Sequence, residues 1–78
     1  MSNQIYWNAK YLLIDQAKEA KRTSGKDKPY VRQVINDSLN SINQQIDWHE
    51  MKEDISLAKA KQYKKWLESL ACNLHPKY

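Results

Sequence analysis

Few residues in this chain could do chemistry, and their spacing joins them into no active site. Cys72 and His75 lie three residues apart, a spacing that can bring two side chains to one metal ion. A structural zinc ion takes four ligands, usually from two such pairs, and His49 is the only other histidine or cysteine. We therefore predict no metal site and no cofactor, and we interpret Cys72 as a half-buried thiol at the end of a helix.

Two further arrangements resemble catalytic groups but lack their partners. Ser56 and Lys59 match the S-x-x-K pattern of some serine acylases, whose other motifs and oxyanion hole have no counterpart in this sequence. His49 and Glu50 are adjacent, and neighbouring residues of a helix point about 100° apart, so the two do not face each other. Phosphate-binding loops need several glycines, and the chain has one. We therefore predict that the protein is not an enzyme and has no small-molecule substrate.

A group of lysines in the last third of the chain is the best candidate for nucleic-acid binding. Its members are Lys59, Lys61, Lys64 and Lys65. On a helix, the last three fall within about a third of the circumference, where their ammonium groups could neutralise backbone phosphates. The alternative is a solvated face whose cations complement the C-terminal end of the helix. The net charge of the chain is +4, which solubility alone would explain.

A sharper pattern lies in the first predicted helix, residues 3–22, which is apolar on two sides. Its main face consists of Ile5, Ala9, Leu12, Leu13, Ala17 and Ala20. Trp7, Tyr11 and Ile14 form a second stripe that points roughly the opposite way, and Lys18 marks its edge. Either this helix is wedged between the other two with both faces buried, or the second stripe contacts another chain. Three helices rarely bury two full faces of one member, and Trp and Tyr are enriched at binding hot spots, so we favour an interface.

Hydrophobic periodicity predicts two more helices after a polar loop at residues 23–29. The second helix is predicted over residues 30–46, with an apolar stripe made of Val31, Val34, Ile35, Leu39, Ile42 and Ile46. The third is predicted over residues 48–72, with an inner face made of Met51, Ile55, Ala58, Tyr63, Trp66, Leu67 and Leu70. Residues 73–78 should form a short tail, because Pro76 disfavours helix at the residue before it.

The boundary between the second and third helices is predicted at residues 46–48, although neither Gly nor Pro marks it. The apolar stripe before this point and the one that begins with Trp48 and Met51 differ by about 150° in direction, so a straight helix could not turn both inward. Asp47 followed by Glu50 also matches the capping box with which helices begin. The alternative is one continuous helix through this region.

Length and composition limit the class of protein. The chain has 78 residues, of which 41% are hydrophobic and 28% charged, as in an ordinary small globular domain. No apolar run approaches the ~20 residues that span a bilayer, and the first residues lack the features of a signal peptide. A single cysteine forms no internal disulfide, so we expect a cytoplasmic protein. We predict one all-α domain over residues 1–78, a compact three-helix domain with a short C-terminal tail.

The function expected from these observations is protein binding. The protein should be a small regulator, inhibitor or assembly factor that binds through Trp7, Tyr11, Ile14 and Lys18. Its partner would be another protein or a second copy of the chain, as in a homodimer, and no membrane is expected to take part. The alternative is a basic all-α protein that binds nucleic acid through the face from Lys59 to Lys65. Compact, Lys-rich chains of this kind are common among phage and plasmid accessory proteins, an analogy of composition only.

Overall fold

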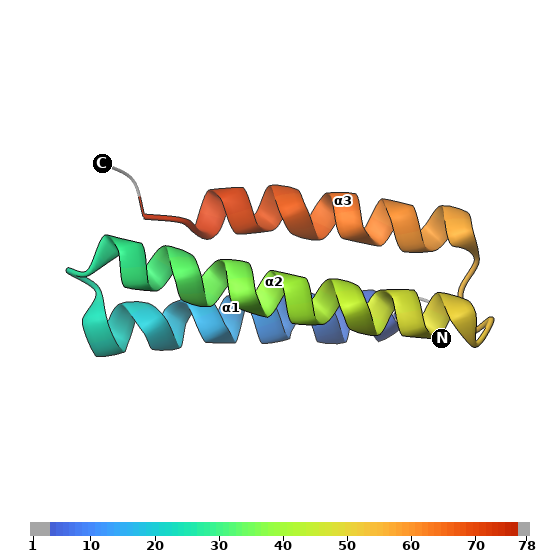
Figure 1. Ribbon diagram of the computed structural model, residues 1–78, viewed down its shortest axis with the longest axis horizontal. Helices are drawn as coiled ribbons and strands as arrows, with labels where there is room; N and C mark the ends of the chain where they lie inside the picture. Colours follow the sequence, from blue (N-terminus) through green and yellow to red (C-terminus); the bar gives the residue numbers. More distant parts are fainter. Residues whose placement is uncertain (1–3, 77–78) are drawn as a thin grey trace.

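Three helices fold into an antiparallel up-down-up bundle in the computed structural model, which describes residues 4–76 (Figure 1). Helix α1 spans Gln4–Ser24, α2 spans Lys28–Met51 and α3 spans Leu57–Leu74. Neighbours in sequence run antiparallel, so α1 and α3 run parallel to each other. The Cα trace measures 41 × 17 × 16 Å, so the bundle is long and narrow. The predicted all-α three-helix fold is confirmed.

The core is a single row of side chains along the axis of the bundle. Helix α1 contributes Leu13, Ala17 and Ala20, and the connection before α3 contributes Ile55. Helices α2 and α3 each contribute one stripe at helical spacing, made of Val31, Ile35, Ile42, Ile46, Ala60, Tyr63, Leu67 and Ala71. Alanine is frequent in α1 and α3, and its small size lets backbones approach closely. No polar or charged residue among residues 4–76 is buried.

The connection between α1 and α2 is shorter than the predicted loop and is built from three residues, 25–27. Gly25 is required here because a Cβ atom would lie 2.5 Å from the carbonyl oxygen of Lys21. Asp27 is the N-cap of α2, and its carboxylate accepts a hydrogen bond from the backbone N–H of Tyr30 at 3.1 Å. Pro29 lies in the first turn, where its missing N–H costs nothing. These local signals place the start of α2 two residues before the predicted one.

The predicted helix boundary at residues 46–48 is wrong, because α2 continues without a break to Met51. Asp47 lies inside α2 and caps nothing; its carboxylate forms an ion pair with Lys64 of α3. The 150° change of direction is no obstacle, because Trp48 and Met51 do not face the core. Their side chains are 50% and 71% exposed. Helix α2 therefore has a single buried stripe, which includes Ile42 and Ile46, and it stays straight without turning a second stripe inward.

The observed break lies at residues 52–56 and is a capping structure. Glu53 adopts φ 65°, the left-handed conformation that stops a helix. The ring of His49 hydrogen-bonds to the carboxylate of Asp54 at 3.0 Å, and this bond, aided by the charge of Lys52, lowers the pKa of Asp54. Ser56 is the N-cap of α3: its hydroxyl accepts a hydrogen bond from the backbone N–H of Lys59 at 3.1 Å. Ser56 and Lys59, the two residues that match the S-x-x-K pattern, therefore form the N-terminal cap of α3.

The end of α3 packs back on the start of α2. The helix continues to Leu74, two residues beyond the prediction, and His75 follows as its C-cap. The guanidinium of Arg32 donates a hydrogen bond to the carbonyl oxygen of Pro76 at 3.3 Å. The ring of His75 is partly buried, and its Nδ1 has no hydrogen-bond partner among residues 4–76. Burial, reinforced by the positive charges of Arg32 and Lys21, lowers the pKa of His75.

The position of the caps gives a stability test. Ser56→Ala should lower the free energy of unfolding by about 1 kcal/mol, because α3 loses the hydroxyl that accepts from Lys59. Asp47→Ala should change it by less than about 0.5 kcal/mol, because the lost ion pair with Lys64 is exposed to solvent. Urea unfolding followed by circular dichroism measures both. A larger loss for Asp47→Ala than for Ser56→Ala would contradict the observed boundary.

The surroundings of His75 make stability depend on pH. Its pKa is lower in the folded chain than in the unfolded chain, so acidification protonates the unfolded state first. The stabilisation of the folded state that comes from the neutral form of His75 should be complete above about pH 6.5, where an unperturbed histidine titrates. It should be lost as the pH falls toward the lower pKa that His75 has in the folded chain. Urea midpoints at several pH values for the natural chain and His75→Gln measure it. We expect a smaller loss on acidification in the variant; equal losses would contradict this prediction.

Candidate functional site

Five aromatic rings gather where α1 meets α3. Tyr6 lies at the centre, with ring centroids 5.3 Å from those of both Tyr63 and Trp66. Trp7 lies 5.7 Å from Tyr6 and 6.0 Å from Tyr11, so the row continues outward along α1. Rings at these separations, in tilted or edge-to-face arrangements, attract each other beyond their burial. We call these five residues the aromatic cluster.

The aromatic cluster runs from the core to the surface. Tyr63 is buried and Tyr6 is partly buried. Trp7 is 42% exposed, Trp66 is 44% exposed and Tyr11 is 59% exposed. The inner members fix the outer rings by packing, so the exposed aromatic surface is held by the core rather than by a loop.

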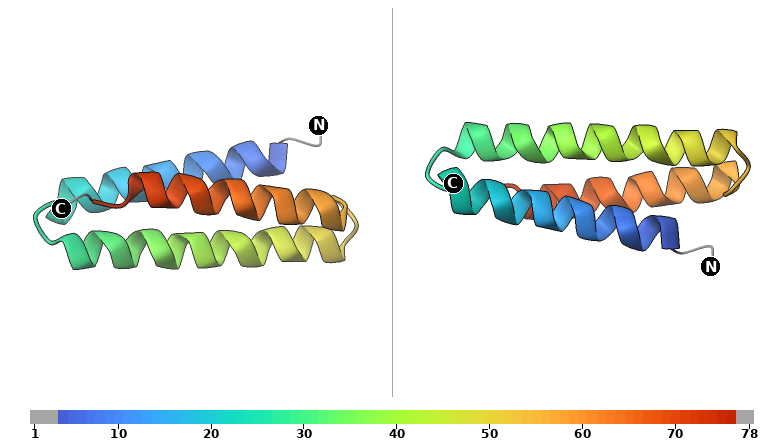
Figure 2. Two further views of the ribbon diagram at one scale, coloured as in Figure 1. Left: turned by 90° about the horizontal axis from the view of Figure 1, so that it is seen from above. Right: turned by 90° about the horizontal axis from the view of Figure 1, so that it is seen from below.

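Helix α1 is not wedged between its neighbours with both faces buried. The views of Figure 2 show α1 inclined to α2, with the two helices close at their connection and apart toward the start of α1. Of the predicted stripe, Trp7 and Tyr11 are exposed and Ile14 is partly buried. Lys18, at the edge of that stripe, is exposed as well.

Sequence reasoning assigned Trp66 to the inner face of α3 and gave Tyr6 no role. Trp66 lies three residues after Tyr63 and one before Leu67, so it stands at the edge of the buried stripe and reaches the surface beside α1. Met51 and Ala58 are also predicted to be inside and are exposed for other reasons: Met51 is the last residue of α2, and Ala58 lies on the side of α3 opposite the buried stripe. The exposure of Trp66 could have been predicted from its position around the helix, which differs from that of the two buried residues Tyr63 and Leu67. Only the contact with Tyr6 joins it to Trp7.

The four lysines of the basic group point in different directions. Lys64 is partly buried and pairs with Asp47 of α2. Lys61 and Lys65 are exposed on the outer side of α3. Lys59 lies four residues before the buried Tyr63, so helical spacing puts it on the side of α3 that faces α1. Lys61, Lys64 and Lys65 therefore share about a third of the circumference of α3, with Lys64 engaged by Asp47, whereas Lys59 lies on another side.

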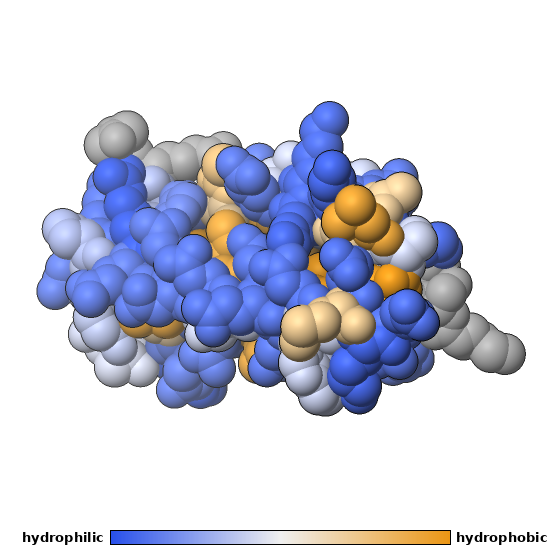
Figure 3. Space-filling view, turned by 45° about the vertical axis from the view of Figure 1, so that its right-hand side comes forward, coloured by the Kyte–Doolittle hydropathy of each residue, from blue (hydrophilic) through white to orange (hydrophobic). Residues whose placement is uncertain are grey.

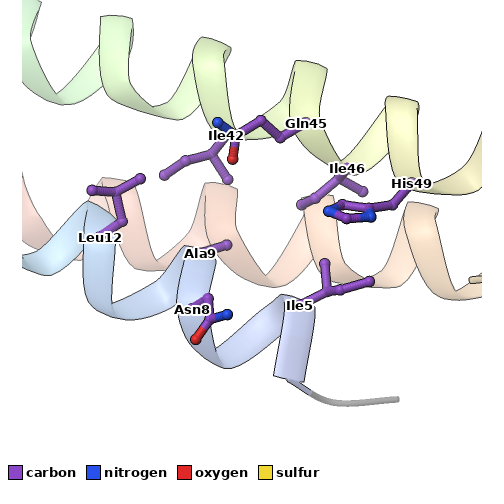
Figure 4. A pocket seen from close by; sticks show the side chains of 8 residues that line it. All are labelled: Ile5, Asn8, Ala9, Leu12, Ile42, Gln45, Ile46 and His49. Atoms are coloured by element: carbon purple, nitrogen blue, oxygen red, sulfur yellow. The ribbon is translucent and has the colours of Figure 1, made fainter. Parts of the chain in front are cut away.

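A shallow groove lies on the other side of α1, where it diverges from α2. Its volume is about 220 Å³. Figure 4 shows side chains of both helices directed toward it: Ile5, Asn8, Ala9, Leu12, Ile42, Gln45, Ile46 and His49. Leu12 is 43% exposed although the sequence places it on the main apolar face. The reason is that α1 and α2 diverge toward the start of α1, so α2 does not cover this side chain (Figure 2). The groove has an apolar floor and a few polar groups at its rim.

Apolar side chains also reach the surface elsewhere, in small groups between hydrophilic ones (Figure 3). Trp48, Met51 and Leu57 are all at least half exposed near the connection between α2 and α3. The ammonium group of Lys52 lies 3.9 Å from the centre of the Trp48 ring and covers part of it. The Trp48 ring also meets that of His49, with centroids 5.3 Å apart, but among residues 4–76 no ring contact leads on from this pair to a fully buried residue.

The residues that could have done chemistry lie apart. Cys72 is exposed, which corrects the predicted half-buried thiol. His49 is engaged by Asp54 and does not meet Glu50. Within residues 4–76, no three His, Cys, Asp or Glu side chains come close enough together to hold a metal ion. The same residues contain no helix with the length and apolar character needed to cross a membrane.

Comparison of the chain with protein-family models, curated proteins and solved structures finds no match. The side chains of the chain itself are therefore the basis for assigning a function.

The aromatic cluster gives a second stability test. Trp7→Ser should lower the free energy of unfolding by about 2 kcal/mol, because 42% of the side chain is already exposed and only the rest leaves a packed environment. Tyr63→Ala should cost about 3–5 kcal/mol, because it opens a cavity beneath the cluster. Chemical unfolding of both variants checks the order. A loss at Trp7 as large as that at Tyr63 would mean that Trp7 belongs to the core.

Proposed function

We propose that this chain is a small, non-enzymatic protein-binding module whose binding surface is the exposed part of the aromatic cluster. It would act by occupying a surface of its partner, as a regulator, an inhibitor or an assembly factor does. The observation that carries this proposal is the exposure of three rings, those of Trp7, Tyr11 and Trp66, that are joined to one another through Tyr6.

The residue types support protein binding. Trp and Tyr are enriched among the residues that dominate binding energy, because they bury a large area and keep a polar tip. Trp7 and Tyr11 supply rings from α1, and Trp66 supplies one from α3. Contiguous exposed apolar patches usually mark interaction sites, whereas single exposed apolar residues need no explanation.

The support beneath the rings also favours binding. Tyr6 packs on the buried Tyr63, so the outer rings lose little conformational freedom when a partner arrives. Preorganisation of this kind lowers the entropic cost of association. The exposed group at Trp48, Met51 and Leu57 has no comparable support and is the weaker candidate.

Nucleic-acid binding through the basic group has less support. Lys64 is engaged by Asp47, Lys59 is exposed on another side of α3, and Lys61 and Lys65 alone are exposed side by side on its outer side. Two ammonium groups would neutralise few phosphates, so the affinity expected at physiological salt is low.

Exchange of one ring tests the proposal. Trp7→Ser should weaken binding of the partner by about 2 kcal/mol or more, roughly thirtyfold, as truncation of a hot-spot residue does. Trp48→Ser is the matched control, because Trp48 has a similar exposure but lies outside the cluster. Affinity capture from the native cell identifies candidates, and titration calorimetry with each purified candidate measures the loss.

Light scattering of the natural chain over a concentration series covers the case in which the partner is a second copy. The proposal is overturned if neither a captured protein nor a second copy binds in a way that depends on Trp7. It is overturned equally if Trp48→Ser weakens binding as much as Trp7→Ser does.

A further inference from the structure

The charges of this protein are divided unequally among its helices. Helix α3 carries four lysines and one carboxylate, and α1 carries four cations and two carboxylates. Helix α2 has the opposite balance, with two cations and three carboxylates. The aromatic cluster lies on α1 and α3. The exposed rings are therefore flanked by the positive part of the molecule.

Individual cations stand beside the rings. The ammonium group of Lys10 lies 4.7 Å from the centre of the Trp7 ring. Lys18 continues the stripe of Trp7 and Tyr11 by one further step of seven residues and is exposed. Lys65 is exposed on the outer side of α3, about 100° around the helix from Trp66, so it adds positive charge to α3 but does not stand beside that ring.

The carboxylates of the same two helices offset little of this charge. Glu19 forms an ion pair with Arg22 one turn further along α1. Glu68 follows Trp66 by two residues, so helical spacing puts it on nearly the opposite side of α3, one turn from Lys65. Asp15 is the one carboxylate near the cluster among the described residues of α1 and α3; helical spacing puts it one turn from both Tyr11 and Lys18, so it offsets part of the charge of Lys18, while Lys10 has no carboxylate three or four residues away on α1.

A second copy of the chain is a poor match for this surface. In a symmetric dimer the same patch meets itself, so Lys10 and Lys18 of both copies would approach each other around the rings. Like charges brought together at an interface are costly. A partner with carboxylates around an apolar side chain would complement both the charge and the rings.

Single-stranded nucleic acid is also negative, but the rings are poorly arranged for it. Base stacking needs open ring faces. One face of Trp7 is covered by the ammonium group of Lys10, and Trp66 meets Tyr6 edge to face. The flanking cations at the cluster are lysines, without the guanidinium groups that pair with phosphate in two places at once.

We infer that the partner of the aromatic cluster is an acidic segment of another protein, in which Asp or Glu residues surround one or more apolar side chains. This inference rests on the proposed function and names the chemistry of the partner. The apolar side chains would contact Trp7, Tyr11 and Trp66, and the carboxylates would face Lys10 and Lys18.

Selection from a random peptide library tests the inference. A phage-displayed library of random linear peptides is selected on the natural chain at physiological salt, and peptides that also bind Trp7→Ser are removed. We expect the remaining peptides to be enriched in Asp and Glu together with apolar residues. Their binding should weaken as salt is raised, because exposed charges are screened.

Charge reversal supplies the matched control. The double variant Lys10→Glu and Lys18→Glu should weaken the selected peptides by about tenfold or more. Lys26→Glu with Lys28→Glu makes the same change of net charge at the far connection between α1 and α2, and it should have little effect. Equal losses in the two double variants would overturn the inference.

The other outcomes separate this inference from the proposed function. Peptides that depend on Trp7 but are neutral or basic would overturn the acidic partner and leave protein binding intact. An absence of peptides that depend on Trp7 would overturn both. Self-association that depends on Trp7, measured by light scattering, would replace the acidic partner by a second copy. Tighter binding of a fluorescent single-stranded oligonucleotide than of any peptide, again dependent on Trp7, would assign the surface to nucleic acid.

Discussion

A three-helix bundle has one inner axis, and each helix can turn only one stripe of side chains toward it. In a bundle whose Cα trace is 17 × 16 Å across, that axis is filled by a row of aliphatic side chains, alanines and one tyrosine. Larger rings beside the stripe must lie at the seams between helices. This limit puts Tyr6 against Tyr63 and Trp66. It leaves Trp7 in contact with Tyr6, and Tyr11 in contact with Trp7, with both outer rings partly in water.

The binding surface therefore depends on the same packing that holds the fold together. A ring attached to the core keeps its position without a partner, whereas a ring on a loop would have to be ordered during binding. The uneven division of charge among the helices distinguishes the same surface a second time. Helix α2 has more carboxylates than cations and lies away from the aromatic cluster, whereas α1 and α3 surround the rings with cations. Shape and charge thus single out one side of a small molecule.

The number of helices could be predicted from the sequence, because it follows from the periodic apolar residues and from the polar loop that separates the first two helices. The stripe of Trp7 and Tyr11 was also predictable, since its spacing and its direction away from Leu13 can be calculated. The end of α2 was not, because the Asp47 and Glu50 pattern imitates a cap, and because Trp48 and Met51 were assumed to be buried. Trp66 was missed for a related reason: only the packing of α1 against α3 decides which edge residues reach the surface. The groove at Leu12 depends on the inclination of α1, which no local pattern specifies.

The central claim is that Trp7 and Trp66, far apart in sequence, belong to one binding surface that excludes Trp48. The chain has three tryptophans, so 5-fluorotryptophan labelling gives three fluorine resonances, which single Trp substitutions assign. These resonances can be followed while an acidic, apolar peptide that binds the protein is added. The account predicts that the Trp7 and Trp66 resonances shift together with one dissociation constant while that of Trp48 stays in place. A shift confined to Trp48, or a shift of Trp7 without Trp66, would contradict it.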